Sequence, residues 1–305
     1  MSFEAKCGFI YQREWIACGL ISEQLLCTNT VSEIISITPF LKWAGGKRWF
    51  VQRHTNLLPT TFNRYIEPFL GGGSVFFHLQ PKRSLLGDTN PDLIAAYRGI
   101  KQNWKGVVKS LQYHSRKHSD EHYYEVRDKR PKEVIPRASR MIYLNRTCFN
   151  GIYRVNLRGE FNVPRGTKDA VLLDTDRFDE MAKLLEGADI RIADFEELIN
   201  EAQAGDFVFA DPPYTVRHNF NGFVKYNEKL FSWQDQERLA EALIRAKKRG
   251  AHILSTNANH SSICELYDDC GFKLITTTRF SSISASSEHR KQFDELIISF
   301  TAGEG

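Results

Sequence analysis

The chain has 305 residues, 42% of them hydrophobic and 26% charged, a composition typical of a globular protein large enough for one domain with a sizeable insertion. No apolar run approaches the roughly 18 residues of a membrane-spanning helix, and charged residues such as Glu4 and Arg13 interrupt the apolar residues near the N-terminus. These features argue against a membrane protein and against a secretory signal, so we expect a cytoplasmic protein.

Basic residues cluster in the middle of the chain, although the net charge is only +4. Residues 98–168 hold 17 Lys and Arg against 6 Asp and Glu. This imbalance indicates contact with a polyanion, while a solvated charged surface would give the same count. The six cysteines form no CxxC pair, and no histidine cluster accompanies them at zinc-ligand spacing, so we expect reduced thiols and no bound metal.

Residues 1–37 show no clear period and are expected to form an N-terminal extension. Short apolar runs then recur with helix-like segments between several of them, such as residues 232–248, where Ser232 can cap the first turn and Gly250 follows the last. This alternation predicts an α/β fold with a mainly parallel, Rossmann-like sheet of about seven strands. The expected strands are residues 65–69, 85–87, 190–193, 207–210, 253–255, 272–277 and 295–300.

The segment FLKWAGGKRWF, at residues 40–50, lies just upstream of the first expected strand. Its two glycines, flanked by Trp43 and Lys47, can place an aromatic ring and a cation beside a ligand. The start of an amphipathic helix would show the same pattern, so this segment does not establish a site by itself.

The first expected strand runs into a glycine-rich turn in YIEPFLGGGS, at residues 65–74. Glycine lets the backbone turn sharply and approach a ligand, and the helix expected next offers free N–H groups. Asp88 ends the second strand, where a carboxylate can accept hydrogen bonds from both hydroxyls of a ribose. A nucleoside-bearing ligand fits this arrangement, as would a plain structural turn or a nicotinamide cofactor. The expected lining residues are Glu67, Phe69, Gly71, Gly73 and Asp88.

The basic segment contains RTCFNGIYRVNLRGEFNVPRG, at residues 146–166. Arginine can pair with phosphates or guanine, asparagine can read adenine, and apolar side chains can wedge into a base stack. We interpret this segment as a DNA-reading loop, with a solvated surface as the alternative. The candidate DNA contacts are Arg146, Phe149, Asn150, Arg154 and Asn162.

The fourth expected strand ends in Asp211, Pro212, Pro213 and Tyr214. Ligands bind beyond the carboxyl ends of strands in open α/β sheets, so this tetrad faces the same crevice as the glycines. The exocyclic amine of a base is a poor nucleophile, because its lone pair is delocalised into the ring. Asp211 and a proline carbonyl can accept both of its N–H groups, and Tyr214 offers a ring on which an extruded base can stack. The tetrad therefore predicts amine methylation, although alone it would fit a turn.

Together these motifs resemble the Dam-type DNA adenine-N6 methyltransferases, alpha-class enzymes with a DPPY motif, from about residue 39 to residue 300. The resemblance implies a seven-stranded methyltransferase sheet with an inserted, mostly helical DNA-recognition domain. It also implies S-adenosylmethionine as cofactor, double-stranded DNA as partner and GATC as the usual target. The implied division is an extension at 1–37, a catalytic domain at 38–91 and 173–305, and a target-recognition domain at 92–172.

The resemblance assigns roles position by position. Trp43, Lys47, Asp88 and Asp211 match cofactor-contacting positions of the family, and the segment IADF adds Asp194 and Phe195 near the adenine of the cofactor. The DNA-contacting positions of the family fall on Phe149, Asn150 and Arg154. Two features depart from the family pattern: the extension before residue 39, and TNAN at 256–259 where a Ser-Asn-His sequence is usual.

The implied mechanism is extrusion of the adenine, followed by direct in-line methyl transfer to its N6 with no metal or covalent intermediate. Cytosine-N4 methylation uses similar chemistry, whereas enzymes acting on RNA or on protein glutamine usually carry Asn in place of the acid. A nicotinamide oxidoreductase or a non-enzymatic DNA-binding module are further alternatives, and the latter leaves the DPPY tetrad unexplained. The oligomeric state and the biological role, such as restriction-modification or an orphan methylase, stay open.

Overall fold

The structure is a computed structural model that describes residues 37–156, 158–216, 231–280 and 292–303. The chain divides into two units at residue 36, and every described residue belongs to the second unit, Ser36–Gly305. The N-terminal extension predicted at residues 1–37 therefore lies outside the described residues, apart from Ile37.

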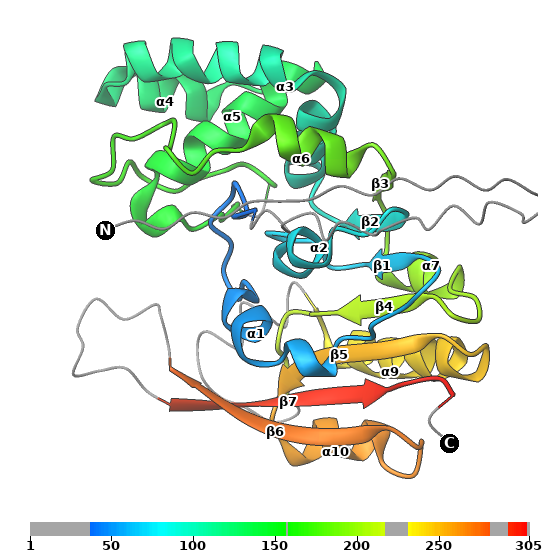
Figure 1. The fold of residues 1–305 in the computed structure, drawn as a ribbon. Coiled ribbons are helices and arrows are strands. Elements are labelled where there is room, and N and C mark those ends of the chain that lie inside the picture. Colours follow the sequence, from blue (N-terminus) through cyan, green and yellow to red (C-terminus); the bar gives the residue numbers. More distant parts are fainter. Residues whose placement is uncertain (1–36, 157, 217–230, 281–291, 304–305) are drawn as a thin grey trace, which may run out of the picture. The chain divides into compact units, whose positions relative to one another are not determined.

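A seven-stranded sheet forms the centre of the second unit (Figure 1), with the order β3-β2-β1-β4-β5-β7-β6. Five neighbouring strands, from β3 through β5, run parallel, whereas β7 is antiparallel to both of its neighbours. The strands are β1 (Tyr65–Glu67), β2 (Ser84–Asp88), β3 (Ala188–Ile192), β4 (Phe207–Ala210), β5 (His252–Ala258), β6 (Lys273–Phe280) and β7 (Gln292–Phe300).

The expected α/β fold with seven strands is confirmed, as a mixed sheet. Each of the seven apolar runs overlaps one strand, because strands buried on both faces carry near-continuous apolar sequence. The central strand β4 shows this pattern, with all four of its residues buried. The predicted helix after residue 232 is also present as α9 (Trp233–Lys248), with a reciprocal capping box between Ser232 and Asp235.

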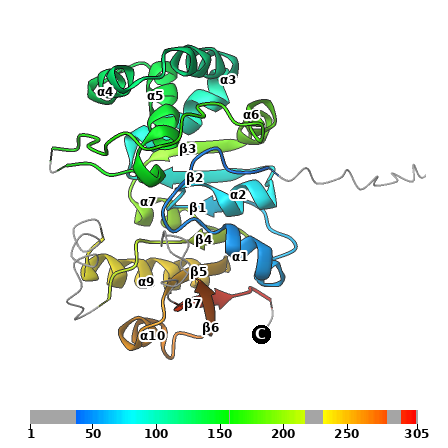
Figure 2. The same ribbon diagram turned by 90° about the vertical axis from the view of Figure 1, so that its left-hand side faces the viewer.

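Helices cover both faces of the sheet (Figure 2), and each face has its own hydrophobic cluster. One face is packed by α7 (Phe195–Asn200), α9 and α10 (Ser261–Tyr267). The opposite face is packed by α1 (Arg48–Arg53), α2 (Ser74–Leu79) and the first turns of α3 (Pro91–Lys117), and a short 3-10 helix, η1 (Thr55–Leu57), follows α1.

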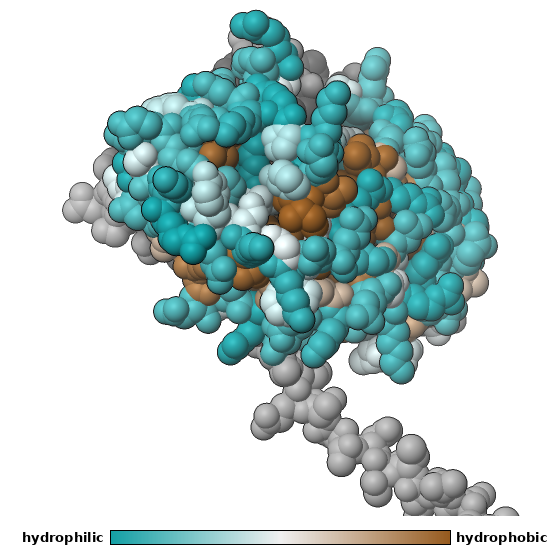
Figure 3. All heavy atoms as spheres, turned by 90° about the horizontal axis from the view of Figure 1, so that it is seen from above, coloured by the Kyte–Doolittle hydropathy of each residue, from teal (hydrophilic) through white to brown (hydrophobic). Residues whose placement is uncertain are grey.

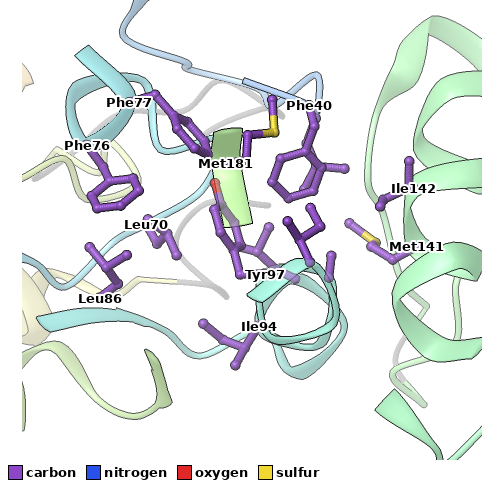
Figure 4. Close-up of a cluster of buried hydrophobic side chains, with 14 of the residues drawn as sticks. Phe40, Leu70, Phe76, Phe77, Leu86, Ile94, Tyr97, Met141, Ile142 and Met181 are labelled. Carbon is purple, nitrogen blue, oxygen red and sulfur yellow. The ribbon is translucent and has the colours of Figure 1, made fainter. Parts of the chain in front are cut away.

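The segment between β2 and β3 is long and begins with helices. It contains α3, α4 (Asp120–Asp128), α5 (Val134–Thr147), the 3-10 helix η2 (Phe149–Gly151), an irregular hairpin and α6 (Phe178–Leu185). Its helices share one hydrophobic cluster with the sheet, in which Met141 and Ile142 lie near Tyr97 and Phe40 (Figure 4). The insertion is therefore packed onto the sheet rather than tethered by a linker. Its outer face is mostly hydrophilic, with apolar patches between the polar side chains (Figure 3).

Candidate active site

The turn between β1 and α2 brings the backbone close to the end of β2. Gly71 and Gly73 have φ angles of 46° and 64°, in the left-handed region that favours glycine. A Cβ on Gly73 would lie 2.7 Å from the Tyr97 hydroxyl, which itself donates to the Gly71 carbonyl. The turn is thus closed underneath by Tyr97, and no larger residue fits at position 73 without displacing it.

Asp88 ends β2 directly beneath this turn. Its Oδ2 accepts the Gly71 N–H at 3.2 Å and its Oδ1 accepts the Asn90 N–H at 2.9 Å. Burial raises the pKa of Asp88 to about 6, and these N–H donors offset part of that rise. Burial also raises the pKa of Glu67, at the end of β1, and the charges of Asp211 and Asp88 add to the effect. Carboxyl groups therefore stand at the carboxyl ends of two adjacent parallel strands.

An aromatic and acidic group lies at the end of β3. Asp194 caps α7, and the Phe195 ring stacks on Phe69 with centroids 5.3 Å apart. Arg238 of α9 donates to Asp194 at 2.7 Å, and its guanidinium carbon lies 4.8 Å from the centroid of the Phe195 ring. Ile192, the last residue of β3, is 50% exposed. The exposed apolar side chain at this end of the sheet is therefore that of Ile192, while the Phe195 ring is buried next to the Asp194 cap.

The residues after β4 hold a buried ion pair. The Lys47 ammonium lies 2.7 Å from Asp211 Oδ1, and the Lys47 side chain is only 4% exposed. The Thr256 hydroxyl, from β5, donates to the same Oδ1 at 2.8 Å. Within the described part of the chain, no hydrogen bond involves Asp211 Oδ2. Both donors converge on Oδ1, so Oδ2 is left as an acceptor.

Tyr214 is fixed at its hydroxyl. It donates to Glu295 Oε2 at 2.9 Å, and the Lys47 ammonium lies 5.1 Å from the centroid of its ring. Burial raises the pKa of Tyr214 well above 10, and the nearby charges of Asp211 and Glu295 raise it further. The phenol therefore stays protonated and keeps donating to Glu295.

A buried amide pair holds the backbone of the tetrad. Asn257 of β5 donates to the Gln236 side-chain carbonyl at 2.9 Å, and the Gln236 amide donates to the carbonyls of Pro213 and Thr215 at 3.5 and 3.3 Å. Neither amide side chain is exposed to solvent. The Pro212 carbonyl accepts no hydrogen bond from any described residue. The Gln236 amide thus fixes the backbone on both sides of Tyr214.

Comparisons with known proteins decide the family. A model of the D12 class of N6 adenine-specific DNA methyltransferases matches residues 43–283. The chain belongs to this family. The methyltransferase is 36% identical to the type II methyltransferase M1.LlaDCHI of Lactococcus lactis subsp. cremoris over 87% of this chain and 95% of that protein. It is 33% identical to M.MjaIII of Methanocaldococcus jannaschii, over 87% and 100% of the two chains. It is 31% identical to the DNA adenine methylase of Escherichia coli strain K12, over 87% and 95%.

The expected DNA-reading loop of the methyltransferase forms a hairpin after α5. Phe149 is 53% exposed, and Asn150 adopts a φ of 57° while its carbonyl accepts a hydrogen bond from the Lys42 ammonium. Arg154 donates to Asn162 at 3.1 Å across the hairpin. These four predicted positions therefore lie on one loop, which also includes residue 157, outside the described residues.

Arg146 of the methyltransferase differs from the other predicted DNA contacts. It is 8% exposed, and its guanidinium forms two hydrogen bonds to Asp176, at 2.6 and 2.7 Å, with others to the carbonyls of Phe40 and Val171. All of these partners lie inside the fold. The guanidinium thus ties α5 to the segments before β1 and before α6.

In the methyltransferase, Trp43 lies between the Gly71 turn and the hairpin. The indole stacks on Tyr153 at a centroid distance of 5.6 Å, and the backbone of the neighbouring Lys42 exchanges two hydrogen bonds with the Asn145 side chain. Tyr153, Glu295, Gln236 and Arg238 were not predicted as site residues, and Thr256 was noted only as part of the TNAN segment. Glu295 was detectable in principle, as an acid inside the apolar run of the last expected strand.

Two further findings hold for the described ranges of the methyltransferase. None of the helices there is long and apolar enough to cross a membrane. No group of three or more His, Cys, Asp and Glu side chains there is arranged to hold a metal ion.

Proposed function

We propose that this DNA adenine methyltransferase uses S-adenosylmethionine to methylate N6 of an adenine extruded from double-stranded DNA, with GATC as the target. The observation that carries the proposal is the arrangement around Asp211. Lys47 and Thr256 both bind Oδ1, which leaves Oδ2 to accept a hydrogen bond from a substrate amine. An amine with two N–H groups needs a second acceptor, and the Pro212 carbonyl is a neighbouring acceptor to which no described residue donates.

The residues of the crevice fit S-adenosylmethionine. The Gly71 turn lets the backbone approach a ligand, and Asp88 presents a carboxylate at the end of β2, where a ribose would lie. The exposed side chain of Ile192, close in the chain to the Asp194 acceptor, suits an adenine ring. When bound, this cofactor would supply an activated methyl group on its sulfonium. In-line displacement by the amine would release the thioether S-adenosylhomocysteine as the leaving group.

The protein contributes positioning and electrostatics. Asp211 Oδ2 and the Pro212 carbonyl accept the N6–H groups, which holds the nitrogen in place and favours its lone pair pointing at the methyl carbon. The Tyr214 ring provides the surface for the extruded base. Lys47 keeps Asp211 in place, and with Glu295 nearby this group of three carries one net negative charge, which complements a cationic sulfonium.

We assign DNA recognition to the insertion at residues 92–172 and the catalytic role to 38–91 and 173–305. Phe149, Asn150, Arg154 and Asn162 are the proposed contacts, supported by their common position on one loop and by the exposure of Phe149. Arg146 is left out of this set because its guanidinium is occupied inside the fold. Arg154 then serves DNA binding, so Arg154→Ala should weaken DNA binding more than cofactor binding.

The test is transfer of labelled methyl from S-adenosylmethionine to duplexes that differ only in a GATC site, followed by nucleoside analysis. The proposal expects N6-methyladenine in the GATC duplex alone. Label in a different adenine context would reject the target and keep the cofactor and the chemistry. No label in any duplex would reject the cofactor assignment.

A further inference from the structure

Glu295 is a buried carboxylate that the reaction scheme does not yet use. It lies on β7 and is 1% exposed, and a carboxylate is rarely buried so completely without a partner. Its Oε2 accepts the Tyr214 hydroxyl hydrogen at 2.9 Å. The Lys47 ammonium is farther from it, at 3.9 Å.

The need to neutralise the charge of Lys47 does not explain why the Glu295 carboxylate is buried here. Lys47 already has a closer carboxylate partner, Asp211, at 2.7 Å, together with the Gly45 carbonyl at 3.0 Å. Burying a second carboxylate beside a satisfied ion pair adds desolvation for little extra attraction. The closer contact of Glu295 is the hydroxyl of Tyr214, so its effect on that ring is the function to explain.

The location of Glu295 makes it a rigid anchor. It lies on β7 between two hydrogen-bonded neighbours, paired with Ala258 on β5 and with Thr277 on β6. Tyr214, in contrast, follows the end of β4 on irregular backbone. The hydrogen bond from the Tyr214 hydroxyl to an interior strand therefore restrains a ring whose own backbone lies outside the strands.

We propose that Glu295 is a positioning residue that fixes the plane of the Tyr214 ring for the extruded base. The inference rests on the proposed function, in which Tyr214 stacks on the target adenine. Glu295 touches neither substrate nor reacting atom, and it acts by accepting the hydroxyl hydrogen bond. Stacking orients the base only if the ring is held, and small misplacements of a reacting group cost large factors in rate.

The test compares substitutions that separate the hydrogen bond from the charge. Glu295→Gln keeps an acceptor for the hydroxyl and removes the charge, whereas Glu295→Leu removes both. Tyr214→Phe removes the donor and leaves Glu295 in place. The measurement is the single-turnover rate of methyl transfer at saturating cofactor and DNA, together with the affinity for S-adenosylhomocysteine. Asp294→Leu, an exposed acid on the same strand, is the matched control.

We expect Glu295→Gln to stay within about threefold of the wild-type rate, and Glu295→Leu to lose about tenfold or more. Tyr214→Phe should lose a similar factor, and Glu295→Leu should cost nothing further in the Tyr214→Phe background. Affinity for S-adenosylhomocysteine should change little in all of them. If Glu295→Leu does not fold, the proposal is tested by Glu295→Gln and Tyr214→Phe, where only the second should slow transfer.

Two outcomes would overturn the proposal. Equal losses for Glu295→Gln and Glu295→Leu would show that the charge matters rather than the hydrogen bond. Losses that multiply in the double variant would show that Glu295 does not act through Tyr214. Both differ from a failure of the proposed function, in which the wild-type protein itself would transfer no methyl from S-adenosylmethionine to DNA.

Discussion

Removing Lys47 should destabilise the protein strongly, because its ammonium pairs with the partly buried Asp211 and lies near the buried carboxylate of Glu295. It lies 2.7 Å from Asp211 and 3.9 Å from Glu295. At an effective dielectric constant of about 20, the closer attraction alone has a ceiling of about 6 kcal/mol. Breaking one partner of a buried ion pair usually costs about 3–5 kcal/mol. Because the Asp211 side chain is 18% exposed and can be partly hydrated, we expect Lys47→Met to lower the free energy of unfolding by about 3 kcal/mol.

The assay is urea unfolding followed by circular dichroism, with the slope of the transition checked for constancy. Lys101→Met is the control, since the Lys101 ammonium donates to the Ala188 carbonyl and forms no ion pair within 4.0 Å among the described residues. It should lose less than about 1 kcal/mol. Adding Glu295→Gln to Lys47→Met should recover part of the loss, because it removes one stranded charge. A loss below about 1 kcal/mol for Lys47→Met would refute the reasoning.

Three further predictions concern the crevice and the insertion. Gly71→Ala should weaken S-adenosylhomocysteine binding about tenfold in calorimetry, because its Cβ would lie 2.7 Å from Trp43 at a strained φ of 46°. Arg238→Ala should weaken the same binding about fivefold, because its guanidinium restrains Phe195. Burial, with the charges of His122 and Lys129, lowers the pKa of His114 from 6.5 to about 4, so the folded protein favours its neutral form. The neutral His114 side chain makes its full contribution to stability above pH 6.5, and this contribution is lost as the pH falls toward 4. His114→Asn should therefore flatten the pH dependence of the urea midpoint in that range.

The two predictions on cofactor binding each have a matched comparison. Gly159→Ala introduces similar backbone strain at a φ of 75° with no heavy atom within 4 Å of the new Cβ, so cofactor binding should not change. Arg245→Ala removes a neighbouring arginine of α9 that pairs with Glu196 without a described contact to Phe195, and affinity should stay within about twofold. If these controls match the test variants, or if His114→Asn keeps the full pH dependence, the corresponding explanation is wrong.

Local sequence predicted the sheet well. The apolar run at 207–210 becomes a strand with every residue buried, and the cap at Ser232 forms as expected, because both signals depend on residues close in the chain. The antiparallel insertion of β7 between β5 and β6 was not predictable in this way. Strand order depends on pairing between segments far apart in sequence, and apolar patterning does not encode it.

Several site residues were predicted individually, whereas the contacts between them were not predicted. Lys47 and Asp211 were singled out separately, and their ion pair became visible only in the fold. Glu295, Gln236 and the role of Asn257 were missed, because a buried polar residue gains meaning only once its partner is known. For Arg146, the basic neighbours in sequence suggested DNA contact, whereas the fold pairs its guanidinium with Asp176, thirty residues away in the chain.

The most direct test of the central claim is the single-turnover rate of methyl transfer by Asp211→Ala on duplex DNA, measured with saturating S-adenosylmethionine. Asp189→Ala, which removes an exposed acid paired with Arg191, is the matched control. If Asp211 accepts an N6–H group of the target adenine, the rate should fall at least about a hundredfold, while DNA binding persists and the control is unchanged. A rate within about tenfold of the wild type would contradict the assignment of Asp211 and the mechanism built on it.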